Sequence, residues 1–147
     1  MKKRVFVLAS LFVLSIMVAA QVAQAEQPML VNVPFEFVAG NVTLPAGEYR
    51  VQKLERNAGI LLINSSDPRA AVMLVTHAAQ AREPQTESKL IFNRYDQRYF
   101  LSQVWTAGSN LGRQLSKSPR EKEVAQSARI ETKVQITLVA RLFPARP

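Results

Sequence analysis

The chain has 147 residues, which is the length of a single domain, and it contains no Cys and one His. Without Cys it can form neither disulfide bonds nor thiolate metal sites, and thiol catalysis is excluded. The formal net charge is +8, and it comes from residues 2–4 and from the basic C-terminal third, residues 106–147. That distribution predicts either a solvated surface or a contact between the C-terminal third and an anionic polymer.

The first 25 residues have the three parts of a secretory signal peptide. Residues 2–4 are cationic, residues 5–20 are an apolar run, and residues 23–25 form an Ala-x-Ala cleavage site. The apolar run is shorter than the roughly 20 residues of a membrane-spanning helix. We therefore expect cleavage after Ala25, export to the periplasm or the cell exterior, and no later transmembrane segment.

Short extended segments fill the next part of the chain. Residues 29–38 alternate apolar and polar side chains, as a half-buried strand does, and Pro34 predicts that this strand lies at a sheet edge. A turn at residues 44–47 leads into a strand over residues 48–54. Residues 60–63 and 70–76 are apolar on both faces, which is typical of central strands that are covered on both sides.

Residues 88–95 and 98–105 predict a β-hairpin around the two-residue turn Asp96–Gln97. Its register pairs Arg94 with Tyr99, Phe92 with Leu101 and Leu90 with Gln103. One face then carries Leu90, Phe92, Tyr99, Leu101 and Trp105, and the other carries Ile91, Tyr95, Phe100 and Val104. At least one of these faces must belong to the core.

The same hairpin carries the candidate ligand-binding residues Tyr95, Arg94, Arg98 and Trp105. Aromatic rings beside guanidinium groups could stack on a sugar ring or an aromatic ligand. Nucleic acid is not expected as a partner, because residues 26–105 balance their charges and the chain carries an export signal.

Residues 118–121, Ser-Pro-Arg-Glu, predict the start of a helix that runs from Pro119 to about Ala128. We expect this helix to cover one face of the central strands. Residues 133–142 alternate weakly, which predicts a last strand or a continuation of the helix.

The predicted organisation is a signal peptide (1–25), a β-domain (26–118), and a C-terminal helix with a basic tail (119–147). The fold class is all-β, a small antiparallel sandwich or flattened barrel of about seven or eight strands with one C-terminal helix.

No catalytic residue, metal site or cofactor is predicted. His77 is the sole candidate for a histidine base, and no Gly-x-Ser-x-Gly segment is present to accompany it. Paired carboxylates could hydrolyse a glycoside, although acidic residues are also common in turns and on solvent-facing strand surfaces. The acids considered are Glu36, Glu48, Glu55, Asp67, Glu83, Glu87 and Asp96.

Five segments are shared with a group of small secreted proteins of environmental bacteria, mostly of unassigned function, which the chain resembles. They are residues 33–37 (VPFEF), 44–51 (LPAGEYRV), 92–95 (FNRY), 98–101 (RYFL) and 116–118 (SKS). The resemblance implies a small β-rich exported domain and supplies no catalytic residues.

These observations favour a non-enzymatic module that binds or scaffolds an unknown envelope component or small ligand. A small carbohydrate-active hydrolase with paired carboxylates is the alternative.

Overall fold

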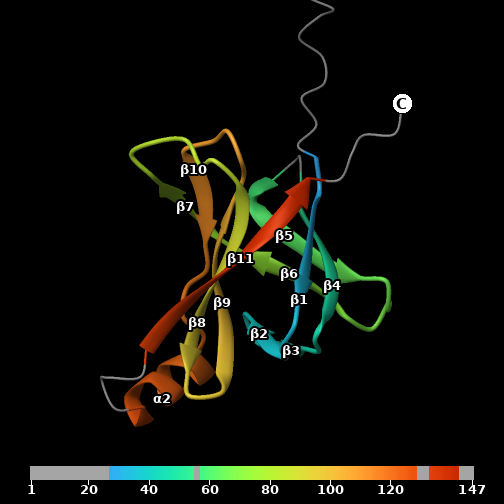
Figure 1. The fold of residues 1–147 in the computed structure, drawn as a ribbon. Helices are drawn as coiled ribbons and strands as arrows, with labels where there is room; N and C mark the ends of the chain where they lie inside the picture. Colours follow the sequence, from blue (N-terminus) through green and yellow to red (C-terminus); the bar gives the residue numbers. More distant parts are fainter. Residues whose placement is uncertain (1–26, 55–56, 129–132, 143–147) are drawn as a thin grey trace, which may run out of the picture.

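The computed structural model describes residues 27–54, 57–128 and 133–142 (Figure 1), so the predicted signal peptide lies outside the described residues. One sheet holds eleven strands. They are β1 (Met29–Val33), β2 (Phe37–Ala39), β3 (Val42–Leu44), β4 (Gly47–Leu54), β5 (Asn57–Ser65), β6 (Ala71–Val75), β7 (His77–Gln80), β8 (Ser88–Tyr95), β9 (Arg98–Trp105), β10 (Leu111–Gln114) and β11 (Lys133–Leu142). The helix α2 spans Pro119–Ser127.

The mostly β architecture with one helix is confirmed, but the number of strands and the purely antiparallel pairing are not. The strands follow the order β3-β2-β9-β8-β11-β1-β4-β5-β6, and β2 pairs with β9 in parallel. Three features raise the strand count. Pro34 lies between β1 and β2, Thr76 separates β6 from β7, and β10 forms where no strand was predicted.

The sheet curls until it is nearly closed. Strand β7 continues from the last strand of the path and pairs with β10, which also pairs with β9. Thr76 lies at the corner between β6 and β7, and its backbone N and Oγ1 both donate to the carbonyl oxygen of Gly59. Arg113 of β10 donates from Nε to Thr76 Oγ1 and from Nη2 to Thr76 O, both at 2.8 Å. These bonds hold β10 against the corner between β6 and β7 and so help to close the curled sheet.

The core lies inside this curled sheet. Phe37 lies at its centre, with its ring edge-to-face against Tyr49 at 5.3 Å and against Phe92 at 5.4 Å between centroids. The buried aliphatic residues around these rings include Val31, Val33, Leu44, Val51, Leu61, Ile63, Leu90 and Leu101. Leu74 of β6 belongs to the same core, so large apolar side chains from eight strands take the place of the disulfides that the sequence lacks.

The prediction of one edge strand over residues 29–38 is wrong. Strand β1 pairs with β4 along its whole length and with β11 at Met29 and Leu30. The chain leaves the sheet at Pro34, which has no N–H to donate, and re-enters it as β2. Proline therefore divides the segment instead of marking an edge.

The expectation of two covered central strands is also wrong in part. Strand β5 lies between β4 and β6, but β6 ends the strand path. The outward side chains of Met73 and Val75 are 63% and 78% exposed. Helix α2 does not cover them, because it packs against Val38, Tyr95 and Phe100 instead.

The hairpin is confirmed, with a correction at its far end. Arg94 pairs with Tyr99 and Phe92 with Leu101, but a β-bulge then shifts the register, so that Leu90 pairs with Val104. The extra residue moves Val104 to the inner face and turns Trp105 away from it. Trp105 therefore covers Gly112 of β10 and does not share the face of Leu90.

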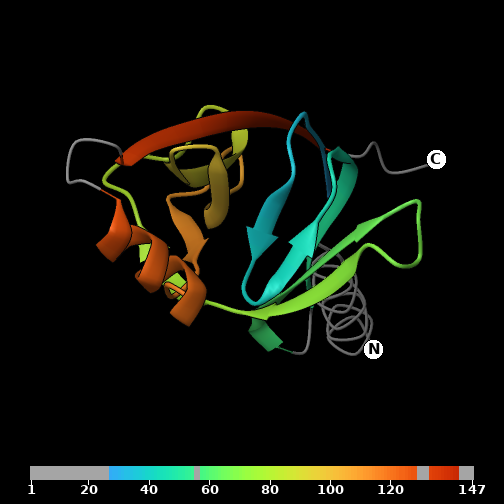
Figure 2. The same ribbon diagram turned by 90° about the horizontal axis from the view of Figure 1, so that it is seen from below.

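The C-terminal segment belongs to the same folded unit (Figure 2). Ser118 caps α2 and accepts a hydrogen bond from the backbone N of Glu121 at 3.2 Å, as predicted. Residues 133–142 form a strand, which pairs with β8 and then with β1. Figure 2 shows β11 crossing one side of the molecule from the α2 end to β1.

Candidate functional site

Two adjoining grooves lie at the turn end of the β8–β9 hairpin. The larger has a volume of about 680 Å³ and runs between the hairpin turn and α2; it is lined by Tyr95, Asp96, Gln97, Arg98, Arg120, Glu123, Val124, Ser127 and Ala128. The smaller, of about 220 Å³, runs between the hairpin and the β2–β3 segment. Its lining is Phe35, Glu36, Phe37, Val38, Thr43, Gln97, Arg98, Tyr99, Phe100 and Arg120.

Arg98 and Arg120 line both grooves. Both side chains are exposed, and Arg120 donates from Nη1 to Thr43 Oγ1 at 3.0 Å. Among the residues that the structure describes, neither guanidinium is ion-paired with a carboxylate. Because each guanidinium keeps most of its five donors free, the junction of the grooves can accept an anionic group.

A buried carboxylate holds α2 beside the hairpin and so forms one wall of the larger groove. Glu121 is 4% exposed and accepts hydrogen bonds from Asn93 Nδ2 at 2.9 Å and from Tyr95 OH at 3.2 Å. Burial and the negative charge of Glu121 raise the pKa of Tyr95 to about 12. The phenol therefore stays protonated at neutral pH and keeps donating to the carboxylate.

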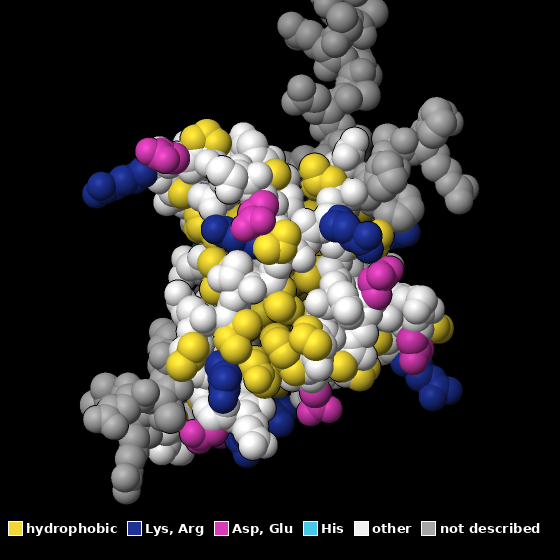
Figure 3. Space-filling view, in the orientation of Figure 1, with side chains coloured by type: hydrophobic (Ala, Val, Ile, Leu, Met, Phe, Trp, Pro, Cys, Tyr) yellow, Lys and Arg dark blue, Asp and Glu magenta, His cyan; other side chains and the backbone are white. Residues whose placement is uncertain are grey.

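The smaller groove has an aromatic wall. Phe35 and Tyr99 are half-buried and stack with their centroids 3.8 Å apart and an interplanar angle of 13°. The Arg94 guanidinium lies 5.9 Å from the Tyr99 centroid. Figure 3 shows that hydrophobic side chains gather on this part of the surface. The two grooves thus bring cations, carboxylates, an amide and ring surfaces together at the turn end of the hairpin.

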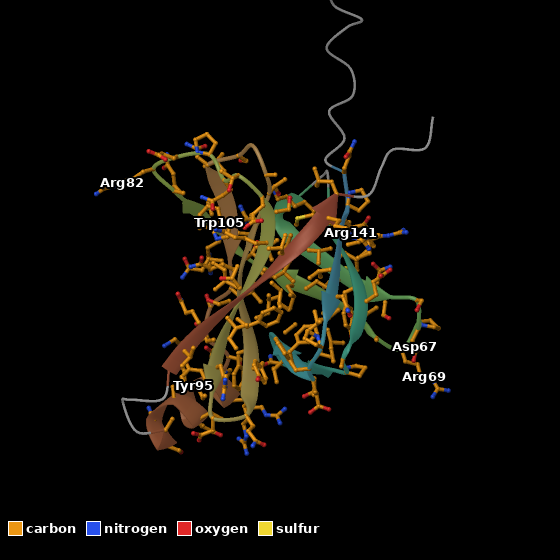
Figure 4. All side chains as sticks on the ribbon, viewed as in Figure 1. Asp67, Arg69, Arg82, Tyr95, Trp105 and Arg141 are labelled. Carbon is orange, nitrogen blue, oxygen red and sulfur yellow. The ribbon has the colours of Figure 1, made fainter. Side chains whose placement is uncertain are left out.

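The four candidate ligand-binding residues are divided between two places, and Figure 4 shows Tyr95 and Trp105 far apart along the hairpin. Tyr95 and Arg98 line the larger groove, and Arg94 lies next to them with its Nε bonded to the backbone oxygen of Asp96. Trp105 lies at the opposite end of the hairpin, 8% exposed, with its Nε1 bonded to Gln103. The structure therefore does not bring Trp105 to the grooves.

Sequence reasoning missed the contributions of α2 and of Phe35. Arg120 and Glu123 reach the larger groove because the helix packs on the hairpin. The only signal in the sequence was the Ser-Pro-Arg-Glu start of the helix, which gives its position in the chain and not its partner surface. Glu121, the last residue of that Ser-Pro-Arg-Glu segment, turns its side chain inward to Asn93 and Tyr95.

A serine and the single histidine meet away from the grooves. His77 Nε2 lies 3.0 Å from Ser116 Oγ, and both side chains are exposed. No carboxylate among the described residues is hydrogen-bonded to His77, so the third member of a catalytic triad is absent from this part of the chain. This pair was not expected, because the two residues are 39 positions apart.

The described residues contain no group of three or more potential ligands that could hold a metal ion. They also contain no helix with the length and hydropathy needed to cross a membrane. A scan against protein-family models and searches of curated proteins and solved structures find no match to this chain. The candidate function therefore depends on the geometry of the grooves.

Proposed function

We propose that the protein is an exported, non-enzymatic module that binds an anionic oligosaccharide in the two joined grooves. The observation that carries the proposal is the position of Arg98 and Arg120, which are exposed and line both grooves. An acidic sugar placed across the junction would meet both guanidinium groups.

The lining of the grooves suits a sugar better than a purely apolar ligand. Asp96, Gln97 and Ser127 offer acceptors and donors for hydroxyl groups. Tyr99 and Phe35 add ring surface in the smaller groove, where the apolar face of a pyranose could pack. Arginine also recognises carboxylate groups through paired N–H donors, which favours a uronic acid over a neutral sugar.

The test is calorimetric titration with a short oligogalacturonate and with its fully methyl-esterified form, which has the same sugar but no charge. We expect binding of the acidic form alone, weakening as salt is added because the grooves are open to solvent. The double variant Arg98→Glu with Arg120→Glu should abolish binding. The control is the double variant Arg69→Glu with Arg82→Glu. It changes the net charge by the same amount at exposed positions outside the grooves (Figure 4), and it should bind as the unaltered protein does.

Equal binding of the acidic and esterified forms, or no binding of either, would overturn the proposal. So would a double Arg98, Arg120 variant that still binds as the unaltered protein does.

A hydrolase with paired carboxylates is the second candidate, because Asp96 and Glu123 line the same groove. Both carboxylates are exposed, whereas the acid of such a pair is normally held in an apolar environment. The assay is the release of reducing ends from oligogalacturonate. Release by the unaltered protein that is lost in the Asp96→Asn variant would establish hydrolysis in place of simple binding.

A further inference from the structure

The outer side of β5 and β6 is an apolar surface that no other part of the described chain uses. Met73 and Val75 point outward from β6 and are 63% and 78% exposed. Their cross-strand neighbours are Leu62 and Ile60 of β5, which are half-buried. Four large apolar side chains thus form one patch, here called the β6 patch (Ile60, Leu62, Met73, Val75). A contiguous patch of this kind marks a contact surface more often than isolated apolar residues do.

The backbone of β6 is also open along one edge. Strand β6 pairs with β5, and its other edge pairs with no strand that the structure describes. Exposed sheet edges are normally blunted by charged residues, proline, bulges or very short strands. Residues 71–75, Ala-Val-Met-Leu-Val, contain no charge and no proline, and the β5–β6 pairing has no register shift. The strand at the other end of the path, β3, has only three residues, and its Thr43 is occupied by Arg120.

We infer that β6 is a homodimer contact, in which two copies of the chain pair their β6 strands antiparallel about a two-fold axis at Met73. In this register Met73 faces Met73 of the partner subunit, and Ala71 faces Val75 of the partner subunit. Directly opposite residues share a face of the sheet, so Leu62 and Met73 of both copies form one apolar row across the contact.

Charge favours a second copy over a partner of opposite sign. Apart from residues 2–4 of the predicted signal peptide, the excess positive charge lies in the C-terminal third, so an acidic partner would be drawn to the cationic surfaces of that third. The β6 patch has no charge, and residues 71–75 are apolar at every position, so the strand is complementary to itself. Two cationic copies can approach each other with least repulsion at this uncharged strand.

The expected dimer is reversible. Five residues of strand pairing with a four-residue patch give a contact smaller than a stable obligate interface. The β6 contact is also separate from the grooves, since none of its residues lines them. The inference therefore stands whether or not the grooves bind a sugar.

Disulfide trapping tests the register directly, because the chain has no cysteine of its own. Met73→Cys should form a disulfide-linked dimer under mild oxidation, since opposite residues of an antiparallel pair are close enough to be bridged. Val75→Cys is the matched control on the same strand. Its side chain is the more exposed of the two, but its opposite residue is Ala71 of the partner subunit, so it should not cross-link to itself.

A mixture of Ala71→Cys and Val75→Cys proteins should then form the mixed disulfide, although neither variant links to itself. Leu111→Cys, on β10 and 54% exposed, measures the rate of random collision.

Sedimentation equilibrium of the unaltered protein should show a mass that rises up to twofold with concentration, and Met73→Lys should abolish that rise. A constant monomer mass, or a Met73→Cys that links no faster than Leu111→Cys, would overturn the inference.

Discussion

Tyr95 shows how burial beside a carboxylate makes the stability of the protein depend on pH. Its ordinary pKa is 10.0, and burial beside Glu121 raises the pKa to about 12 in the folded state. Above pH 10 the phenol ionises in the unfolded chain while the folded chain retains the proton. We therefore expect the contribution of Tyr95 to the free energy of unfolding to be constant below pH 10 and to fall by on the order of 2 kcal/mol as the pH rises through 12.

Tyr95→Phe should remove this part of the alkaline loss, as urea unfolding at a series of pH values would measure. The pKa of Tyr49 is also raised, by burial first and by the charge of Asp67 second, so some alkaline loss remains in the variant. An unchanged pH profile in Tyr95→Phe would contradict the assigned role of Tyr95.

Gly112 is the residue that allows the Trp105 ring to lie flat on β10. A Cβ atom at Gly112 would come within 2.5 Å of Trp105 Cε3, whereas a Cβ at Gly47 would meet nothing closer than 3.9 Å. Gly112→Ala should therefore cost about 1 to 3 kcal/mol of unfolding free energy, and Gly47→Ala should cost much less. Chemical unfolding followed by the fluorescence of Trp105, the only tryptophan, would measure both variants. Equal free energies of unfolding for the Gly112→Ala and Gly47→Ala variants would show that the Trp105 ring can move away from a Cβ atom at Gly112 without cost.

At the scale of elements, α2 is fixed by one carboxylate more than by its apolar face. The helix touches the hairpin through Val124, Ala125 and Ala128, while Glu121 is its one fully buried residue. Glu121→Ala leaves Asn93 and Tyr95 without their acceptor and should cost about 2 to 3 kcal/mol. Amide hydrogen exchange across α2 should also accelerate.

Glu123→Ala is the matched control for that prediction, because Glu123 lies on the same helix and is exposed. It should leave the exchange of α2 unchanged. Equal exchange rates in the two variants would mean that Glu121 does not hold the helix in place.

Element types were predictable where the signal is local. The Asp96–Gln97 hairpin, the turn before Gly47 and the Ser118 cap all depend on residues adjacent in sequence, and all three form. The bulge between Ile91 and Phe92 was not predictable, because the pairing of Leu90 with Val104 depends on core packing contributed by other strands. The prediction that β6 is covered on both faces was wrong because the apolar pattern of a strand does not show whether another element covers it.

At the scale of the whole molecule, Arg113 of β10 helps to close the curled sheet through its bonds to Thr76 at the corner between β6 and β7. Arg113→Ala removes both bonds to Thr76, so we expect a loss of about 1 to 3 kcal/mol and faster hydrogen exchange in β7 and β10 together. Arg82→Ala, in the exposed loop between β7 and β8, is the control and should change neither quantity. Acceleration of exchange confined to β10 would mean that the corner does not depend on Arg113.

The candidate site was partly predictable from sequence at this scale. Tyr95, Arg94 and Arg98 come from one hairpin turn, so their proximity follows from the hairpin alone. Arg120, Glu123 and Phe35 reach the same place only through the packing of α2 and of the β2–β3 segment, which has no local signal. In the basic C-terminal third, Arg113 is bonded within the fold and Arg120 lines the grooves, and the charge distribution of the sequence alone gives neither position.

The most direct measurement of the central claim is an NMR titration of the backbone amides with oligogalacturonate. The account predicts that shift changes cluster in residues 97–99, at the hairpin turn, and in residues 120–127 of α2. The amides around Trp105 and Gly112, at the far end of the hairpin, should not move. Shift changes centred on that far end, or none anywhere, would contradict the account.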